Sequence, residues 1–166
     1  TPGIVEGLSN VVAIDAGSLS CISFKADGTV WTWGYRSEFD GRGRPTYSRQ
    51  PIPLAAELPD RALAIEAGGS HYLVVLPDGE VWAWGANHSG QLGLGHRRKV
   101  AVPTKVERLS GIIAIAAGWD HAVALGADGT VWELGATRLL FPFDATYNIL
   151  WPTRIDTRET GVRLLP

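Results

Sequence analysis

The strongest constraint on the fold of this chain is a threefold internal repeat. The dipeptide Ala-Gly occurs at residues 16–17, 67–68 and 117–118, at intervals of 51 and then 50 residues. An apolar segment precedes each copy, and apolar residues spaced two apart follow it, as one face of a β-strand requires. Self-similarity at such a period is typical of repeat architectures. We therefore place repeats at approximately 11–60, 61–111 and 112–162, with residues 1–10 in the phase of a preceding unit.

Each repeat also carries the marks of a β-hairpin. Asp-Gly occurs at residues 27–28, 78–79 and 128–129, and this dipeptide favours a tight type I′ turn. The strand that follows places large side chains on alternate positions, so that they share one side. These side chains are Trp31 and Trp33, then Trp82 and Trp84, then Trp132 and Leu134.

The rest of each repeat consists of a loop and a fourth strand. The loop is richest in glycine at residues 87–95. Pro51, Pro103 and Pro152 mark the strand, and proline suits an edge strand, where one backbone donor is dispensable.

Four short strands per repeat, without any segment of helical period, predict an all-β protein made of β-propeller blades. Each blade has four antiparallel strands, and the chain holds three. The small Ala-Gly strand ends suit the crowded inner rim, where backbones approach one axis. The Trp-bearing strands lie further out and should fill the space between blades.

These motifs resemble those of the regulator of chromosome condensation repeat family. Its blades carry an Ala-Gly-x-x-His element, an Asp-Gly turn, Val-Trp-x-Trp-Gly and Gly-Gln-Leu-Gly. The second repeat matches almost throughout, at residues 67–71, 78–79, 81–85 and 90–93.

Two repeats depart from the family pattern. Ser20 takes the histidine position in the first repeat, and residues 35–41 replace its Gly-Gln-Leu-Gly loop. The third repeat keeps His121 but loses the loop at residues 136–143. The resemblance implies a ring of seven blades, and three blades cannot close one.

An open arc of three blades would leave apolar blade faces uncovered at both ends. The chain is therefore either a partial propeller from a longer protein or a homo-oligomer completed by other copies. Residues 2–5 align with residues 103–106, and residues 152–166 repeat the phase of residues 2–16. This overlap predicts that one copy lends a strand to its neighbour.

The composition excludes several classes of partner. Lys and Arg total 15 against 17 Asp and Glu, a formal net charge of −2, so no basic excess is available for nucleic acid or an anionic membrane. Apolar runs fall short of the roughly twenty residues of a membrane span. Cys21 is the single cysteine, which rules out an intrachain disulfide. The sequence indicates no compartment.

No catalytic, metal or cofactor site is predicted. We expect His71 and His121 to be structural, with hydrogen bonds to neighbouring backbone. His88 and His96 lie in a loop without a carboxylate pattern for a ligand set. The aspartates before the turn glycines serve the turn. Asp15 and Glu66 share a repeat position, and we expect the blades to hold them apart.

The loops after Ala-Gly carry the functional prediction. In similar propellers, notably the propeller-type β-lactamase inhibitory protein, aromatic and acidic residues of this loop bind protein. Trp119 is of the type enriched among interface hot spots. Two basic clusters, one at Arg36, Arg42, Arg44 and Arg49 and one at Arg97, Arg98 and Lys99, would suit an acidic partner or be merely solvated. The candidate binding residues are Ser18, Leu19, Gly69, Ser70, Trp119 and Asp120.

The leading hypothesis is a non-catalytic module for protein recognition with a partner that the sequence does not name. A secreted bacterial enzyme inhibitor is an alternative, which exposed aromatics in all three loops would favour, but only Trp119 qualifies. The resemblance also implies nucleotide exchange on a small GTPase, the activity of the founding member. Light sensing, as in the plant ultraviolet-B photoreceptor, has one counterpart here, the Gly-Trp-x-His segment at residues 118–121.

Overall fold

A computed structural model describes residues 3–39, 45–137 and 147–155. The described chain forms three four-stranded antiparallel sheets and no helix, so none there is long and apolar enough to cross a membrane. Blade 1 contains β1 (Val11–Ala16), β2 (Ser20–Lys25), β3 (Val30–Phe39) and β4 (Pro45–Ala56). Blade 2 contains β5 (Ala64–Ala67), β6 (His71–Val75), β7 (Val81–Gly85) and β8 (Val100–Lys105). Blade 3 contains β9 (Ile112–Ala117), β10 (His121–Gly126), β11 (Val131–Thr137) and β12 (Tyr147–Ile155).

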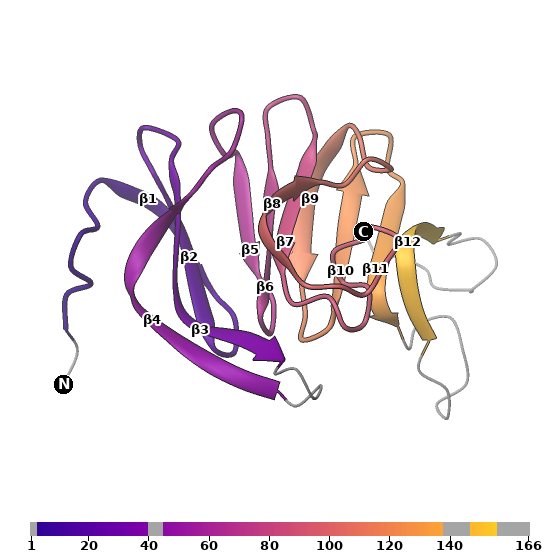
Figure 1. Cartoon of the computed structure of the whole chain (residues 1–166). Coiled ribbons are helices and arrows are strands. Elements are labelled where there is room, and N and C mark those ends of the chain that lie inside the picture. Colours follow the sequence, from indigo (N-terminus) through magenta and orange to yellow (C-terminus); the bar gives the residue numbers. More distant parts are fainter. Residues whose placement is uncertain (1–2, 40–44, 138–146, 156–166) are drawn as a thin grey trace.

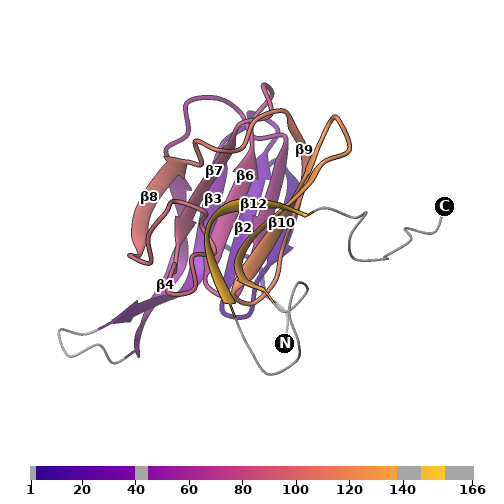
Figure 2. The ribbon, with the colours of Figure 1, turned by 90° about the vertical axis from the view of Figure 1, so that its right-hand side faces the viewer.

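The three blades follow one another along an arc, in chain order from indigo to yellow (Figure 1). Within each sheet the strands lie in sequence order, and β5 contacts both β1 and β9. Seen along the arc, the sheets stand one behind another (Figure 2). The predicted propeller blades are therefore confirmed, with the strands that end in Ala-Gly at the inner rim.

The Asp-Gly hairpins form, but the predicted type I′ turn is wrong. That turn needs positive φ at both central residues, and only the glycines have it: Gly28, Gly79 and Gly129 have φ of 84°, 77° and 81°. In the first hairpin, Gly28 N donates to Lys25 O and Lys25 N to Thr29 O, which makes a three-residue loop. The aspartate accepts from the backbone two residues on, at 3.0 Å in all three copies. The aspartates thus serve the turn, as predicted.

The proline of the fourth strand was misassigned in the first repeat. Thr32 pairs with Leu54, as Ala83 pairs with Thr104 and Glu133 with Thr153. The residue before each partner is Pro53, Pro103 or Pro152, so Pro53 rather than Pro51 is the equivalent position. Counting from the preceding Gly failed because blade 1 connects its third and fourth strands through a longer ribbon.

The Trp-bearing side of each blade packs on the aliphatic side of the blade before it. Trp84 and Val74 of blade 2 share a core with Ile22 and Val30 of blade 1. Leu134 of blade 3 and its strand neighbours pack in the same way against Leu73 and Val81 of blade 2. Trp84 is 4% exposed, so the predicted role of these residues in filling the space between blades is confirmed. Each interface is heterologous, because the two faces that meet are different.

Two carboxylates join the inner strands of successive blades. Asp15 Oδ2 accepts a hydrogen bond from Ala67 N at 2.6 Å, and Glu66 Oε2 accepts one from Ala117 N at 3.4 Å. Asp15 and Glu66 accept from different amides, and partial burial, and then the charge of Asp15, raise the pKa of Glu66. Ala116 occupies this position in blade 3, which has no carboxylate to offer a following blade.

We predict that Glu66→Gln is at least as stable as the natural chain at pH 8, because the amide oxygen still accepts from Ala117 while the repulsion with Asp15 is lost. Because the folded pKa of Glu66 is raised, its ionisation lowers stability as the pH rises through that pKa, so the advantage should shrink near pH 4. Glu66→Ala should lose about 1 kcal/mol with the hydrogen bond. Urea unfolding of the three proteins at both pH values measures this, and a less stable Gln variant at pH 8 would contradict it.

Candidate protein-binding face

The three loops that follow Ala-Gly meet at one end of the blades. Gly69 N donates to Gly118 O at 3.2 Å and to Trp119 O at 3.1 Å. A Cβ on Gly17 would collide with the carbonyl oxygen of Gly68, so the first two loops are in direct backbone contact. Residues 16–18, 67–69 and 117–119 together line a hollow of about 330 Å³. The loops predicted to bind protein thus form one continuous surface.

The residues that directly follow the third-strand glycines, Tyr35, Ala86 and Ala136, flank this surface. Ala86 N donates to Ser70 O at 2.8 Å and Ala136 N donates to Asp120 O at 2.9 Å. In blade 1, Tyr35 N donates to Leu19 O at 2.6 Å. The Ala-Gly loops lie at the lower end of the sheets in Figure 1, opposite the Asp-Gly turns. We call this end the loop face.

The six predicted binding residues differ in what they present. Trp119 is 64% exposed and Leu19 is 38% exposed, so both offer apolar surface to a partner. Ser18 is also exposed and Ser70 is half-buried. Gly69 is buried and serves the backbone contact between loops. Asp120 Oδ1 lies 3.0 Å from His88 Nε2.

The loop face includes two residues that the sequence reasoning missed as binding candidates. Tyr35 is 43% exposed beside Leu19, and His88 extends from blade 2 to Asp120 of blade 3. The register of the hairpin could have predicted the position of Tyr35. The turn pairs Ser20 with Gly34, so the residue after Gly34 must lie against the residue before Ser20.

The two family histidines sit in different surroundings. Each ring occupies the space that a Cβ would need on the preceding glycine, Gly68 or Gly118. His71 is fully buried, and the prediction that it bonds neighbouring backbone is wrong, because neither ring nitrogen has a hydrogen-bond partner among the described residues. Burial, and then the charges of His121 and His88, lower the pKa of His71 to about 4. His121 on the last blade is exposed.

His71 should make the protein acid-sensitive. The pKa of His71 in the folded protein lies below the ordinary 6.5. The contribution of the neutral ring to the free energy of unfolding, about 3 kcal/mol in all, is therefore fully present above pH 6.5 and is lost as the pH falls toward 4. In His71→Phe an apolar ring fills the same space and this loss should disappear. Urea unfolding of both proteins at pH 7.5 and 4.5 measures this loss. An equal drop in the free energy of unfolding of the two proteins would show that His71 does not cause the acid sensitivity.

The remaining titratable groups of the described chain were predicted to hold no metal or to form basic clusters. No group of three His, Cys, Asp or Glu that could hold a metal occurs in the part of the chain that the structure describes. Of the basic clusters, Arg49, Arg97 and Arg98 are exposed and Lys99 is half-buried. The side chains of Arg36, Arg42 and Arg44 lie outside the described residues.

Family models agree with the repeat structure. Two models of the regulator of chromosome condensation (RCC1) repeat match residues 78–125 and residues 63–91. Yeast RCC1 (Prp20), in complex with Kap60, superposes on 93% of this chain with a TM-score of 0.76 and 26% identity. The chain belongs to the RCC1 repeat family.

The chain spans only part of the length of the curated relatives described below. RCC1 domain-containing protein RUG3, mitochondrial, of Arabidopsis thaliana is 32% identical over 66% of the chain, and the Arabidopsis ultraviolet-B receptor UVR8 is 34% identical over 61%. The chain spans 25% and 24% of these two proteins, and 38% of the Prp20 chain. Human E3 ubiquitin-protein ligase HERC2 is 33% identical over 61% of the chain, which covers 2% of HERC2.

Proposed function

We propose that this chain is a non-catalytic protein-recognition module whose partner binds on the loop face. The main support for this proposal is the exposure of Trp119. This large aromatic side chain is 64% exposed on a loop whose backbone is hydrogen-bonded to the neighbouring blade. A rigid aromatic side chain loses little conformational entropy on binding, and such residues dominate interface energetics. Leu19 and Tyr35 add apolar surface, and Arg97 and Arg98 add positive charge suited to an acidic partner.

The relatives support a protein partner. Yeast Prp20p has binding properties toward Gsp1p and histones, and it also forms a complex with Kap60. An inhibitor that covers an active site with aromatics from all three loops has less support here. Ser18, Leu19, Gly69 and Ser70 supply none in the first two loops after Ala-Gly.

Trp119→Ala tests the loop face. We expect this variant to retain less than about a fifth of a protein captured by the natural chain, because a central interface Trp typically contributes 2 kcal/mol or more. Ile113→Ala is the control, since Ile113 is 60% exposed near the start of β9, at the end of the sheet that carries the Asp-Gly turns. Quantitative mass spectrometry of captured protein measures the effect. Equal recovery with both variants would remove Trp119 from the binding surface.

We propose further that other blades cover both ends of the arc, supplied by a second copy of this chain. Because each interface joins a Trp-bearing side to an aliphatic side, the exposed side of blade 1 is complementary to that of blade 3 rather than to itself. The blade 1 side carries Trp31 and Trp33, and the blade 3 side carries Val123, Leu125 and Val131. Head-to-tail contacts of this kind generate closed rings or longer arrays.

The N-terminal segment supports this proposal. Asn10 (φ 55°) and Gly111 (φ 63°) take the same left-handed conformation, and their carbonyls accept from Ala26 N and Ala127 N at 2.8 and 2.9 Å. Residues 6–10 thus repeat the turn at 107–111, which follows the last strand of blade 2. Val106, directly after that strand, is fully buried, whereas its counterpart Val5 is 37% exposed. Residues 3–5 thus stand where the end of a last strand stands before the equivalent turn, and no described strand pairs with them.

We predict that Val5→Asp lowers the mass in solution, measured by light scattering at micromolar concentration. Val5 is 37% exposed and would pack into the neighbouring copy as its counterpart Val106 packs into the core shared with blade 3, where an unpaired carboxylate is unfavourable. Ile52→Asp is the control, because Ile52 is 69% exposed on β4 at the outer rim. A natural chain that is monomeric with a cooperative melt would contradict self-association.

A further inference from the structure

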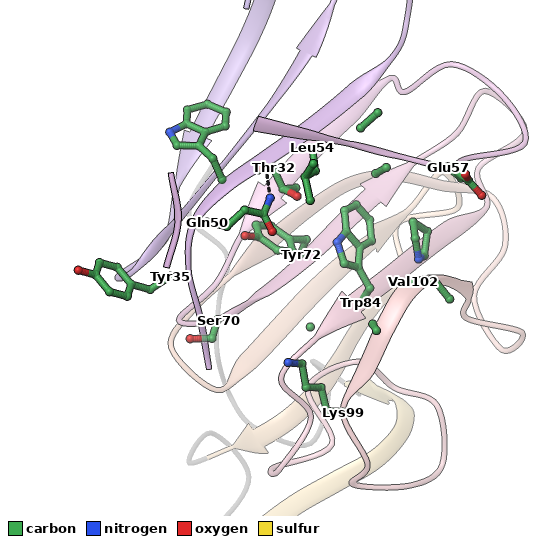
Figure 3. A pocket seen from close by; sticks show the side chains of 16 residues that line it. Thr32, Tyr35, Gln50, Leu54, Glu57, Ser70, Tyr72, Trp84, Lys99 and Val102 are labelled. Carbon is green, nitrogen blue, oxygen red and sulfur yellow. Dashed lines mark hydrogen bonds between the residues drawn. The ribbon is translucent and has the colours of Figure 1, made fainter. Parts of the chain in front are cut away.

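A cavity of about 290 Å³ opens between blade 1 and blade 2 at the outer rim. Figure 3 shows the ring of Trp84 among side chains from both blades, with Leu54 from blade 1 and Val102 from blade 2. Ser70 and Lys99 line it toward the loop face. This volume lies at the small end of the range for ligand sites, which suits one or two side chains of a peptide.

The corresponding space between blades 2 and 3 is filled by the Gly-Gln-Leu-Gly loop of blade 2. Leu92 is fully buried in the core that these two blades share. A Cβ on Gly93 would collide with Leu134, and one on Gly95 with Trp151. Gly95 N donates to Leu150 O at 2.8 Å. The glycines let this loop lie flat on blade 3 while its leucine enters the gap.

The wall of the cavity is the structural counterpart of that filled site. Strand register makes Trp84 equivalent to Leu134, because each pairs with the residue after the repeat histidine position. It likewise makes Val102 equivalent to Trp151 and Pro103 equivalent to Pro152. Trp84 on β7 is larger than Leu134 on β11, whereas Val102 on β8 is smaller than Trp151 on β12. The residues that receive the loop on blade 3 are thus present on blade 2, and they line the cavity.

In blade 1, the described residues of the same connection form no loop that enters the gap. Its third and fourth strands continue as a paired ribbon, with Arg36 opposite Ser48 and Phe39 opposite Pro45. The ribbon extends away from the sheets (Figure 2). In blade 2 the same connection leaves the sheet after Gly85 and is held by Asn87, whose side chain bonds His96 O at 2.8 Å and Leu92 N at 3.0 Å.

We propose that the cavity beside Trp84 is a peptide-binding site that takes a glycine-flanked leucine from a loop of a partner protein. The filled site between blades 2 and 3 is the template for the occupant. It indicates an apolar side chain at the depth of Leu92, flanked by glycines where the backbone passes over Val102 and Pro103. The inference deepens the proposed protein-binding function and rests on it for the source of the loop. The cavity site itself is separate from Trp119.

A peptide copied from the chain's own template tests the site. The probe is Asn-His-Ser-Gly-Gln-Leu-Gly-Leu-Gly, the sequence of residues 87–95. Its control has Ala at the position of Leu92. Amide chemical shifts of the labelled protein, followed to millimolar peptide, should move for Tyr72, Trp84 and Val102. The control should bind at least about tenfold more weakly, because it buries less apolar surface.

Two matched variants locate the binding. Val102→Asp places a charge in the cavity and should weaken peptide binding at least about tenfold. Val12→Asp makes the same change on β1 at similar exposure, 57% against 65%, and should leave binding unchanged. No binding of the leucine peptide, equal binding of both peptides, or equal loss in both variants would overturn the proposal. The Trp119→Ala variant should bind the peptide normally. The peptide result can therefore be interpreted even if the loop face binds no partner.

A chimera gives a second readout that avoids the entropy cost of ordering a free peptide. Residues 35–52, which lie between Gly34 and Pro53, are replaced by the sequence of residues 86–102. The grafted loop should fill the cavity, raise the melting temperature and abolish peptide binding. The same graft with Ala in place of the transplanted leucine should melt lower than the graft that keeps it. Equal melting of the two chimeras would show that the cavity does not receive the leucine.

Discussion

Every blade of this protein has two apolar faces, and each face needs a different neighbour. A four-stranded sheet with Trp82 and Trp84 on one side and Leu73 and Val81 on the other cannot bury both sides by itself. Blade 2 is stable because blade 1 covers its Trp-bearing side and blade 3 covers its aliphatic side. The direction of this packing makes the arc grow by addition of like units, and it leaves two unlike, complementary faces at the ends.

Close approach at the inner rim links this packing to the loop face. The inner strands end in Ala-Gly, and the neighbouring loops touch through backbone atoms because glycine places no side chain between them. Carboxylates from Asp15 and Glu66 fasten successive blades just above these contacts. The loops that carry Leu19 and Trp119 are therefore held by backbone and carboxylate contacts, which is the condition for a surface that binds without large ordering costs.

Local patterns predicted most of the fold. The spacing of Ala-Gly, Asp-Gly and the alternating tryptophans located all three blades and the hairpin in each. The errors came from details that depend on geometry. Asp-Gly took a three-residue loop because only the glycine adopts positive φ. Pro51 was chosen over Pro53 because residue counting cannot detect a lengthened ribbon. The absence of hydrogen bonds at His71 depends on the atoms that surround its ring.

The candidate sites divide in the same way. Trp119 and the Ala-Gly loops were identifiable from sequence because a repeat position implies a common place in every blade. The pairing of His88 with Asp120 and the cavity beside Trp84 were not, because each needs side chains from two blades whose separation no sequence spacing encodes. The sequence by itself determined the blades, since strand pairing within a hairpin is local. Only the tertiary structure decided which gap between blades is filled and which is open, because that depends on where each long loop lies after the blades have packed.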